Sequence, residues 1–118
     1  MGNLTNKITK YQRLLTQLVE GKAQQVNATP GDEITYQAVT DVRNNHFLLV
    51  ALGWADRKFY YQTLMHFDIT SDGKIWIQQN LTEMQVGEAL TAQGVDKKDI
   101  VIGFHPEYLR EHTEYAVR

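Results

Sequence analysis

KFYYQTLMHFDITSDGKIWIQQN, residues 58–80, is the stretch that decides the fold, because its pattern is typical of a single β-hairpin. Apolar side chains recur at every second position, as expected of a strand with one buried face. The buried row would consist of Phe59, Tyr61, Met65, Phe67 and Ile69 in the first strand, and of Ile75 and Ile77 in the second. The pattern predicts two antiparallel strands joined by a turn close to Gly73.

The length of that turn decides which residues face each other across the hairpin. A two-residue loop would direct the two apolar rows to opposite faces of the sheet. A three-residue loop over residues 71–73, with Gly73 in the left-handed region, pairs Ile69 with Ile75 and keeps both rows on one face. We therefore predict the three-residue loop. The opposite face would then carry Tyr60, Gln62, Leu64, His66, Asp68, Trp76 and Gln78.

Helical spacing of apolar residues predicts an amphipathic helix before the hairpin. Its stripe consists of Leu4, Ile8, Tyr11, Leu15 and Leu18. Asn3 or Thr5 would cap its N-terminus, since short polar side chains accept the first free backbone N–H groups. Gly21 and the segment 26–32 would end the helix, with Pro30-Gly31 as a turn.

Two further strands are predicted between this helix and the hairpin. Residues 34–38 alternate as in a half-buried strand, and residues 43–45 make a tight connection. Residues 46–54, HFLLVALGW, are apolar on both faces, which is typical of a central strand. A strand that is apolar on both faces needs a cover on the second face of the sheet, provided either by the C-terminal segment or by another subunit. We therefore expect a homo-oligomer.

The C-terminal third is predicted to be mostly helical. Thr82 and Gln85 match a capping box for a helix over residues 83–93, and Gly94 suits a left-handed C-cap. Residues 100–104 would be a short buried strand, and Pro106 would begin a last helix that ends near residues 113–115. The expected fold is one α+β domain, residues 1–118: a four-stranded antiparallel meander, with a possible short fifth strand, carrying an N-terminal helix and C-terminal helices.

Composition narrows the class of protein. The chain has no cysteine, its first ten residues contain no signal-peptide core, and no run of 18 apolar residues occurs, so we expect a cytoplasmic protein without a membrane span. The net charge of the chain is −2. The first 30 residues carry a charge of +3, so the remaining residues together carry −5. Strong direct nucleic-acid binding is therefore not expected. A weak DNA contact through the basic side chains Lys7, Lys10 and Arg13 is the alternative.

No catalytic or metal-binding motif is present. The four histidines, His46, His66, His105 and His112, are scattered, so no catalytic residue, metal site or cofactor is predicted. His66 lies near Asp68 on the mixed hairpin face and would be an acid–base pair only if a pocket enclosed both. An enzyme or a small-molecule binder is the minor alternative.

Large rings are the remaining unexplained feature, since aromatic residues are enriched at protein interfaces. Trp76 is either covered by another part of the chain or available to a partner, and residues 104–108 form either a docking surface or a strand-to-helix corner. The candidate partner-binding residues are His66, Trp76, Phe104, His105, Tyr108 and Tyr115.

Two stretches carry a family resemblance. DGKIWIQQNLTE (72–83) and GVDKKDIVIGFHPEYLREHTEYAVR (94–118), preceded by YQRLL (11–15), resemble the cyanobacterial XisI family, the fdxN element excision controlling factors. Asp96 departs from the family pattern, which has a proline after the Gly-Val pair, at a position expected to be a loop.

The resemblance implies a small α+β regulatory protein without catalytic residues. It would act in programmed DNA excision beside a site-specific recombinase and a partner of the XisH type, which resembles nuclease-fold proteins. An inhibitor of that nuclease-like partner is a related alternative. We therefore expect a non-enzymatic accessory protein that acts through protein partners.

Overall fold

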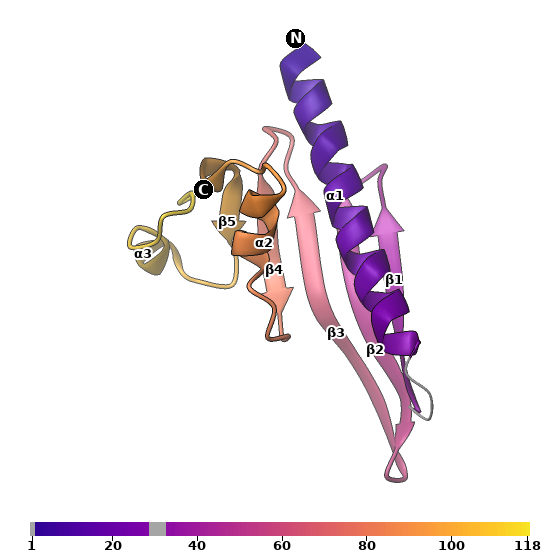
Figure 1. Cartoon of the computed structure of the whole chain (residues 1–118). Coiled ribbons are helices and arrows are strands. Elements are labelled where there is room, and N and C mark those ends of the chain that lie inside the picture. The colour runs from indigo at the N-terminus through magenta and orange to yellow at the C-terminus, as the bar shows by residue number, and fades with distance from the viewer. Residues whose placement is uncertain (1, 29–32) are drawn as a thin grey trace.

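One long helix packs along one face of a five-stranded sheet (Figure 1), and the computed structural model describes residues 2–28 and 33–118 of the chain. The predicted antiparallel meander is confirmed, and the short fifth strand joins it in parallel to the fourth. The helices are α1 (Gly2–Asn27), α2 (Val86–Ala92) and α3 (Glu107–Arg110), with a 3-10 turn at Lys97–Asp99. The strands are β1 (Ile34–Asp41), β2 (His46–Ala55), β3 (Lys58–Ile69), β4 (Ile75–Asn80) and β5 (Ile100–Ile102).

Helix α1 is longer at both ends than the apolar stripe indicated. It begins at Gly2, so Asn3 and Thr5 lie inside the helix, and the prediction of either as N-cap is wrong. It also continues through Gly21, because Val19 and Ala23 extend the buried stripe beyond this residue and hold the last turns on the sheet. The predicted turn at Pro30-Gly31 lies outside the described residues. None of the described helices is long and apolar enough to cross a membrane.

The hairpin turn has the predicted register. Gly73 has φ of 81°, Ile69 pairs with Ile75, and Phe67 pairs with Ile77. All four of these strand residues are buried beneath the helices. The three-residue loop over residues 71–73 therefore placed the residues nearest the turn on the predicted face.

The first half of β3 contradicts the predicted alternation. A β-bulge inserts one extra residue, Leu64, between the pairs Leu49–Met65 and Val50–Thr63. A bulge reverses the alternation on its far side, so Phe59 and Tyr61 lie on the face opposite α1. Tyr60 and Gln62 lie on the α1 face, and Leu64 is buried in the core; the predicted faces of all five residues are wrong.

Helix α2 begins later than predicted. It starts at Val86 after Gln85, and the Thr82 side chain accepts the backbone N–H of Met84 instead of capping a helix. Asn80 fixes this turn, because its side-chain oxygen accepts both the hydroxyl and the backbone N–H of Thr82. Gly94, with φ of 95°, ends α2 as predicted.

The main core lies between the sheet and helices α1 and α2. Helix α1 contributes Tyr11, Leu15, Val19 and Ala23, α2 contributes Val86 and Leu90, and the sheet contributes Phe47, Leu49, Met65, Phe67, Ile75 and Ile77. The β2–β3 hairpin extends beyond the end of α1 as an arm (Figure 1), and the chain is accordingly elongated, at 50 × 32 × 24 Å.

Candidate functional site: the open face of the sheet

Opposite α1, the sheet is only partly covered. The C-terminal segment covers the β4–β5 side: Ala116 bridges to Val101 along β5, and the Arg110 guanidinium lies 5.1 Å from the Trp76 ring centre. The β1–β3 side has no such cover among the described residues. We call this uncovered surface the open face; it carries Val39, Leu48, Leu52, Trp54, Phe59 and Tyr61, together with His46, His66 and Asp68.

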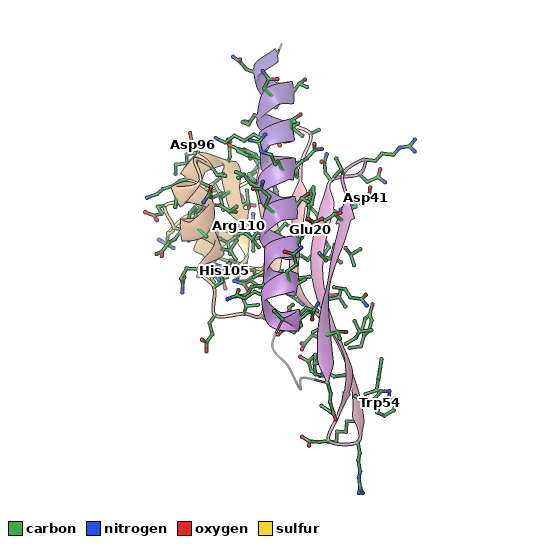
Figure 2. All side chains as sticks on the ribbon, turned by 45° about the vertical axis from the view of Figure 1, so that its right-hand side comes forward. Glu20, Asp41, Trp54, Asp96, His105 and Arg110 are labelled. Carbon is green, nitrogen blue, oxygen red and sulfur yellow. The ribbon has the colours of Figure 1, made fainter. Side chains whose placement is uncertain are left out.

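Three aromatic rings dominate the open face near the end of the arm. Trp54, Phe59 and Tyr61 are between 54% and 66% exposed, and the Trp54 and Phe59 rings contact at 5.3 Å between centres. Trp54 points away from the sheet on the side opposite α1 (Figure 2). Rings of this kind bury about 150–250 Å² each when covered, so the three leave roughly 350 Å² of aromatic surface in water. Patches of this size on monomers commonly mark interaction sites.

The tip of the arm holds two non-glycine residues with positive φ. Asp56 and Arg57 form the β2–β3 turn with φ of 51° and 67°. A two-residue turn with both φ values positive matches the twist of a hairpin. Asp suits its first position, whereas its second position is normally Gly. Arg57 therefore occupies the position that favours Gly, in the turn that keeps Trp54 and Phe59 paired.

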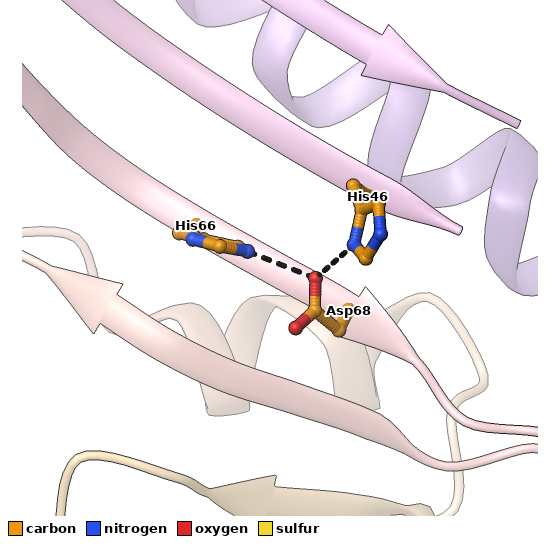
Figure 3. A group of neighbouring side chains, drawn as sticks. All are labelled: His46, His66 and Asp68. Carbon is orange, nitrogen blue, oxygen red and sulfur yellow. Dashed lines mark hydrogen bonds and ion pairs between the residues drawn. The ribbon is translucent and has the colours of Figure 1, made fainter. Parts of the chain in front are cut away.

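Two histidines and one aspartate converge on the open face at the end of β2 and β3 that lies away from the arm (Figure 3). His46 Nδ1 lies 2.7 Å from Asp68 Oδ1, and His66 Nε2 lies 2.8 Å from the same oxygen. The second carboxylate oxygen, Oδ2, accepts a hydrogen bond from Gln78 Nε2 at 3.1 Å. We call His46, His66 and Asp68 the His-Asp cluster.

The Leu64 bulge creates this cluster. The tight turn pairs Ala55 with Lys58, and an uninterrupted ladder from that pair would place His46 opposite Phe67, a core residue. The extra residue shifts the pairing by one, so that His46 faces Asp68. The sequence prediction missed His46 because the bulge has no signature in the alternating pattern of residues 59–69.

Contacts within the His-Asp cluster shift the pKa values of Asp68 and His46. Although partial burial opposes the charge, hydrogen bonds from His46, His66 and Gln78 hold the pKa of Asp68 below its usual value. The hydrogen bond to Asp68 raises the pKa of His46, and the carboxylate of Asp41 adds to the effect. The pair predicted from sequence, His66 and Asp68, is therefore in contact. A shallow groove reaches His66 between Thr63 and Gln78, without Asp68 in its lining.

Trp76 lies on the face opposite α1, as predicted, in register with Asp68. It is half-buried beneath Arg110, which also donates hydrogen bonds to the carbonyl oxygens of His105 at 2.9 Å and Val117 at 2.6 Å. Of the two alternatives for Trp76, cover by the chain itself is the one that the structure supports.

The remaining candidate partner-binding residues divide into two groups. Phe104 and Tyr108 are 51% and 67% exposed, and α3, which carries Tyr108, lies away from the arm (Figure 1). His105 is half-buried, with its ring 4.8 Å from that of Phe104. Tyr115 packs against Gly87 of α2 and the core, and burial raises its pKa. Phe104 and Tyr108 are thus exposed but lie outside the open face, whereas Tyr115 is mainly a packing residue.

Two of the three predicted DNA-contact residues are engaged within the chain. Lys7 pairs with Asp99 at 3.3 Å, and Lys10 donates a hydrogen bond to the carbonyl oxygen of Gly94 at 3.1 Å. Arg13 is exposed on α1. The basic side chains therefore help to dock α1 against the segment 94–99, which weakens the case for a phosphate-binding surface.

The family model for the XisI protein matches residues 5–117. An XisI-like protein from Anabaena variabilis superposes with a TM-score of 0.84 at 36% identity, covering 94% of this chain and 99% of that one. The fdxN element excision controlling factor XisI of the same organism has a TM-score of 0.80 and 24% identity, with coverages of 95% and 99%, which supports the fold. No curated protein matches the chain in sequence. The family resemblance of the two C-terminal motifs is thus confirmed, and the chain belongs to the XisI family.

Proposed function

We propose that this XisI-family chain is a non-enzymatic accessory protein in the control of programmed DNA element excision, and that it acts by binding a protein partner through the open face. Family membership and the fold shared with an excision controlling factor support a role in the control of excision. The open face supports the mode of action. A partner of the XisH type, working beside a site-specific recombinase, is the candidate occupant.

The observation that carries this proposal is the aromatic surface of Trp54, Phe59 and Tyr61 on a protruding arm. Interfaces are enriched in Trp and Tyr, because large rigid rings bury much area with little loss of side-chain entropy. The arm lies beyond the end of α1, so a partner can reach it without displacing the core (Figure 1). A hairpin that served only the fold would not need three half-exposed rings on one face.

The charge distribution favours a protein partner over DNA. Lys7 and Lys10 are paired within the chain, and the net charge is −2. Affinity for DNA comes mainly from neutralised phosphates, and an acidic surface disfavours it. A second copy of the chain is another possible cover for the open face, and the experiment below separates the two occupants.

Co-expression with the XisH-like protein encoded nearest to the chain, followed by size-exclusion chromatography with light scattering, tests the proposal. We expect a complex that persists at low and moderate salt, and its loss in the variant Trp54→Ala/Tyr61→Ala. Tyr108→Ala, which removes an exposed tyrosine on α3, is the matched control and should retain the complex. Separate elution of the two wild-type proteins would sink the proposal. A dimer of the chain alone that the arm variant abolishes would assign the face to self-association.

A further inference from the structure

Ring nitrogens from two neighbouring strands converge on one carboxylate oxygen in the His-Asp cluster. We propose that His46, His66 and Asp68 bind a divalent transition-metal ion, Zn²⁺ being the representative case. The three ligand atoms all lie within 4.8 Å of one another, and no other group of three or more ligating residues in ranges 2–28 and 33–118 meets this spacing. The inference is independent of the proposed partner.

Binding of an ion requires both contacts to Asp68 to lengthen, and the two ring nitrogens, which lie within 4.8 Å of each other, to settle about 3.3 Å apart. Zinc–nitrogen and zinc–oxygen bonds of about 2.0–2.2 Å in a tetrahedron separate neighbouring ligand atoms by roughly 3.3 Å. The two nitrogens lie 2.7 Å and 2.8 Å from Asp68 Oδ1, so each pair would open by about half an ångström. The rings of His46 and His66 stand at 88° to each other, so they approach a common point without stacking.

The backbone holds the cluster in place before any ion arrives. His46 and Asp68 are directly paired across the β2–β3 ladder, and His66 is two residues from Asp68 on the same face. Gln78 of β4 donates its amide hydrogen to Asp68 Oδ2 and leaves Oδ1 for the ligand position. Outer hydrogen bonds of this kind orient metal ligands and contribute to affinity. Gln78 is therefore a positioning residue of the site.

The donor set selects the class of ion. Two imidazole nitrogens and one carboxylate oxygen suit Zn²⁺, Co²⁺ or Ni²⁺, whereas Mg²⁺ and Ca²⁺ prefer oxygen ligands alone. The side chains of His46, His66 and Asp68 are 50%, 34% and 24% exposed, so an ion can enter from solvent. Three protein ligands leave the fourth tetrahedral position on the open face to water or to a group from a docked molecule.

The competing explanation is that the cluster is only a pair of hydrogen bonds across the strands. In that case the chain would bind metal no better than isolated surface histidines do. His112 supplies a matched comparison, because it is an exposed histidine outside the cluster. The two explanations differ in stoichiometry and in the effect of single substitutions.

The test is titration of the tag-free full chain with Zn²⁺ in competition with a chromophoric chelator, and with Co²⁺ followed by visible absorption. We expect one ion per chain, an absorption band of tetrahedral cobalt, and a rise in Tm that EDTA reverses. His46→Gln, His66→Gln and Asp68→Asn should each weaken binding by at least about 10-fold, and Gln78→Leu by about 10-fold. His112→Gln should bind as the wild type does.

Far-UV circular dichroism of each variant without metal checks that the sheet is intact. Absence of stoichiometric binding in the wild type would overturn the proposal. Equal affinity in the wild type and in the folded Asp68→Asn and His66→Gln variants would overturn it as well, because the ion would then be bound elsewhere.

Discussion

Replacing Arg110 by glutamine should release the C-terminal segment from the sheet and expose Trp76. Arg110 donates hydrogen bonds to the carbonyl oxygens of His105 and Val117, and it lies over the Trp76 ring. Each hydrogen bond from a charged donor at this half-buried site contributes about 1–1.5 kcal/mol, and the cation–π contact about 0.5–1 kcal/mol. The free energy that holds the C-terminal segment on the sheet should therefore fall by about 2.5–4 kcal/mol, and the segment should open before the rest of the chain unfolds.

Tryptophan fluorescence measures this release directly if it is recorded in a Trp54→Phe background, which leaves Trp76 as the single emitter. We expect the Trp76 emission to shift to longer wavelength in Arg110→Gln, and protease cleavage within residues 104–118 to accelerate. Arg13→Gln, which removes an exposed arginine from α1, is the matched control and should change neither. Unchanged emission together with a loss of less than about 0.5 kcal/mol would refute the reasoning.

Two other substitutions test how the helix and the arm are held. Tyr11 donates a hydrogen bond to Asp99 at 2.6 Å, so Tyr11→Phe should cost about 1–3 kcal/mol in urea unfolding at pH 7. Burial and this hydrogen bond raise the pKa of Tyr11 in the folded chain. The stabilisation that the Tyr11 hydroxyl contributes is therefore complete below pH about 10 and declines above it, as the phenol of the unfolded chain ionises. The same decline of stability with pH in Tyr11→Phe would contradict this assignment. Gly53 has φ of 144°, and an added Cβ would lie 2.4 Å from the Glu33 carbonyl oxygen. Gly53→Ala should consequently lower the free energy of unfolding by about 1–3 kcal/mol, whereas an unchanged value would show that the β1–β2 ladder adapts.

The sequence predicted the parts of the fold that depend on local chemistry. Gly73 fits the three-residue turn of the β3–β4 hairpin, and the need to keep both apolar rows on one face selected that loop over the two-residue one. Gly94, which also has a positive φ, ended α2 at the predicted position. The alternation in residues 34–38 and the two-sided apolar pattern of residues 46–54 identified β1 and β2.

The parts that were missed depend on contacts distant in sequence. The Leu64 bulge fits the core because Leu64 and Met65 are both buried there. The alternation of apolar residues in the sequence continues across the bulge and does not reveal it. The consequence of the bulge is that Phe59 and Tyr61 belong to the open face and that His46 meets Asp68. Histidines and aspartates 22 residues apart carry no motif, so a metal site of this kind can be recognised only once the strand register is known.

The central claim is that the open face binds a protein partner, and the most direct measurement is the dissociation constant of the XisH-like protein for matched variants, by isothermal titration calorimetry. Residues at the centre of an interface commonly contribute 2 kcal/mol or more, so Trp54→Ala should weaken binding by about 30-fold or more. Tyr108→Ala, which removes an equally exposed ring on α3, should leave the constant within about twofold of the wild type. Equal affinity in Trp54→Ala and the wild type, or a larger loss in Tyr108→Ala, would contradict the account.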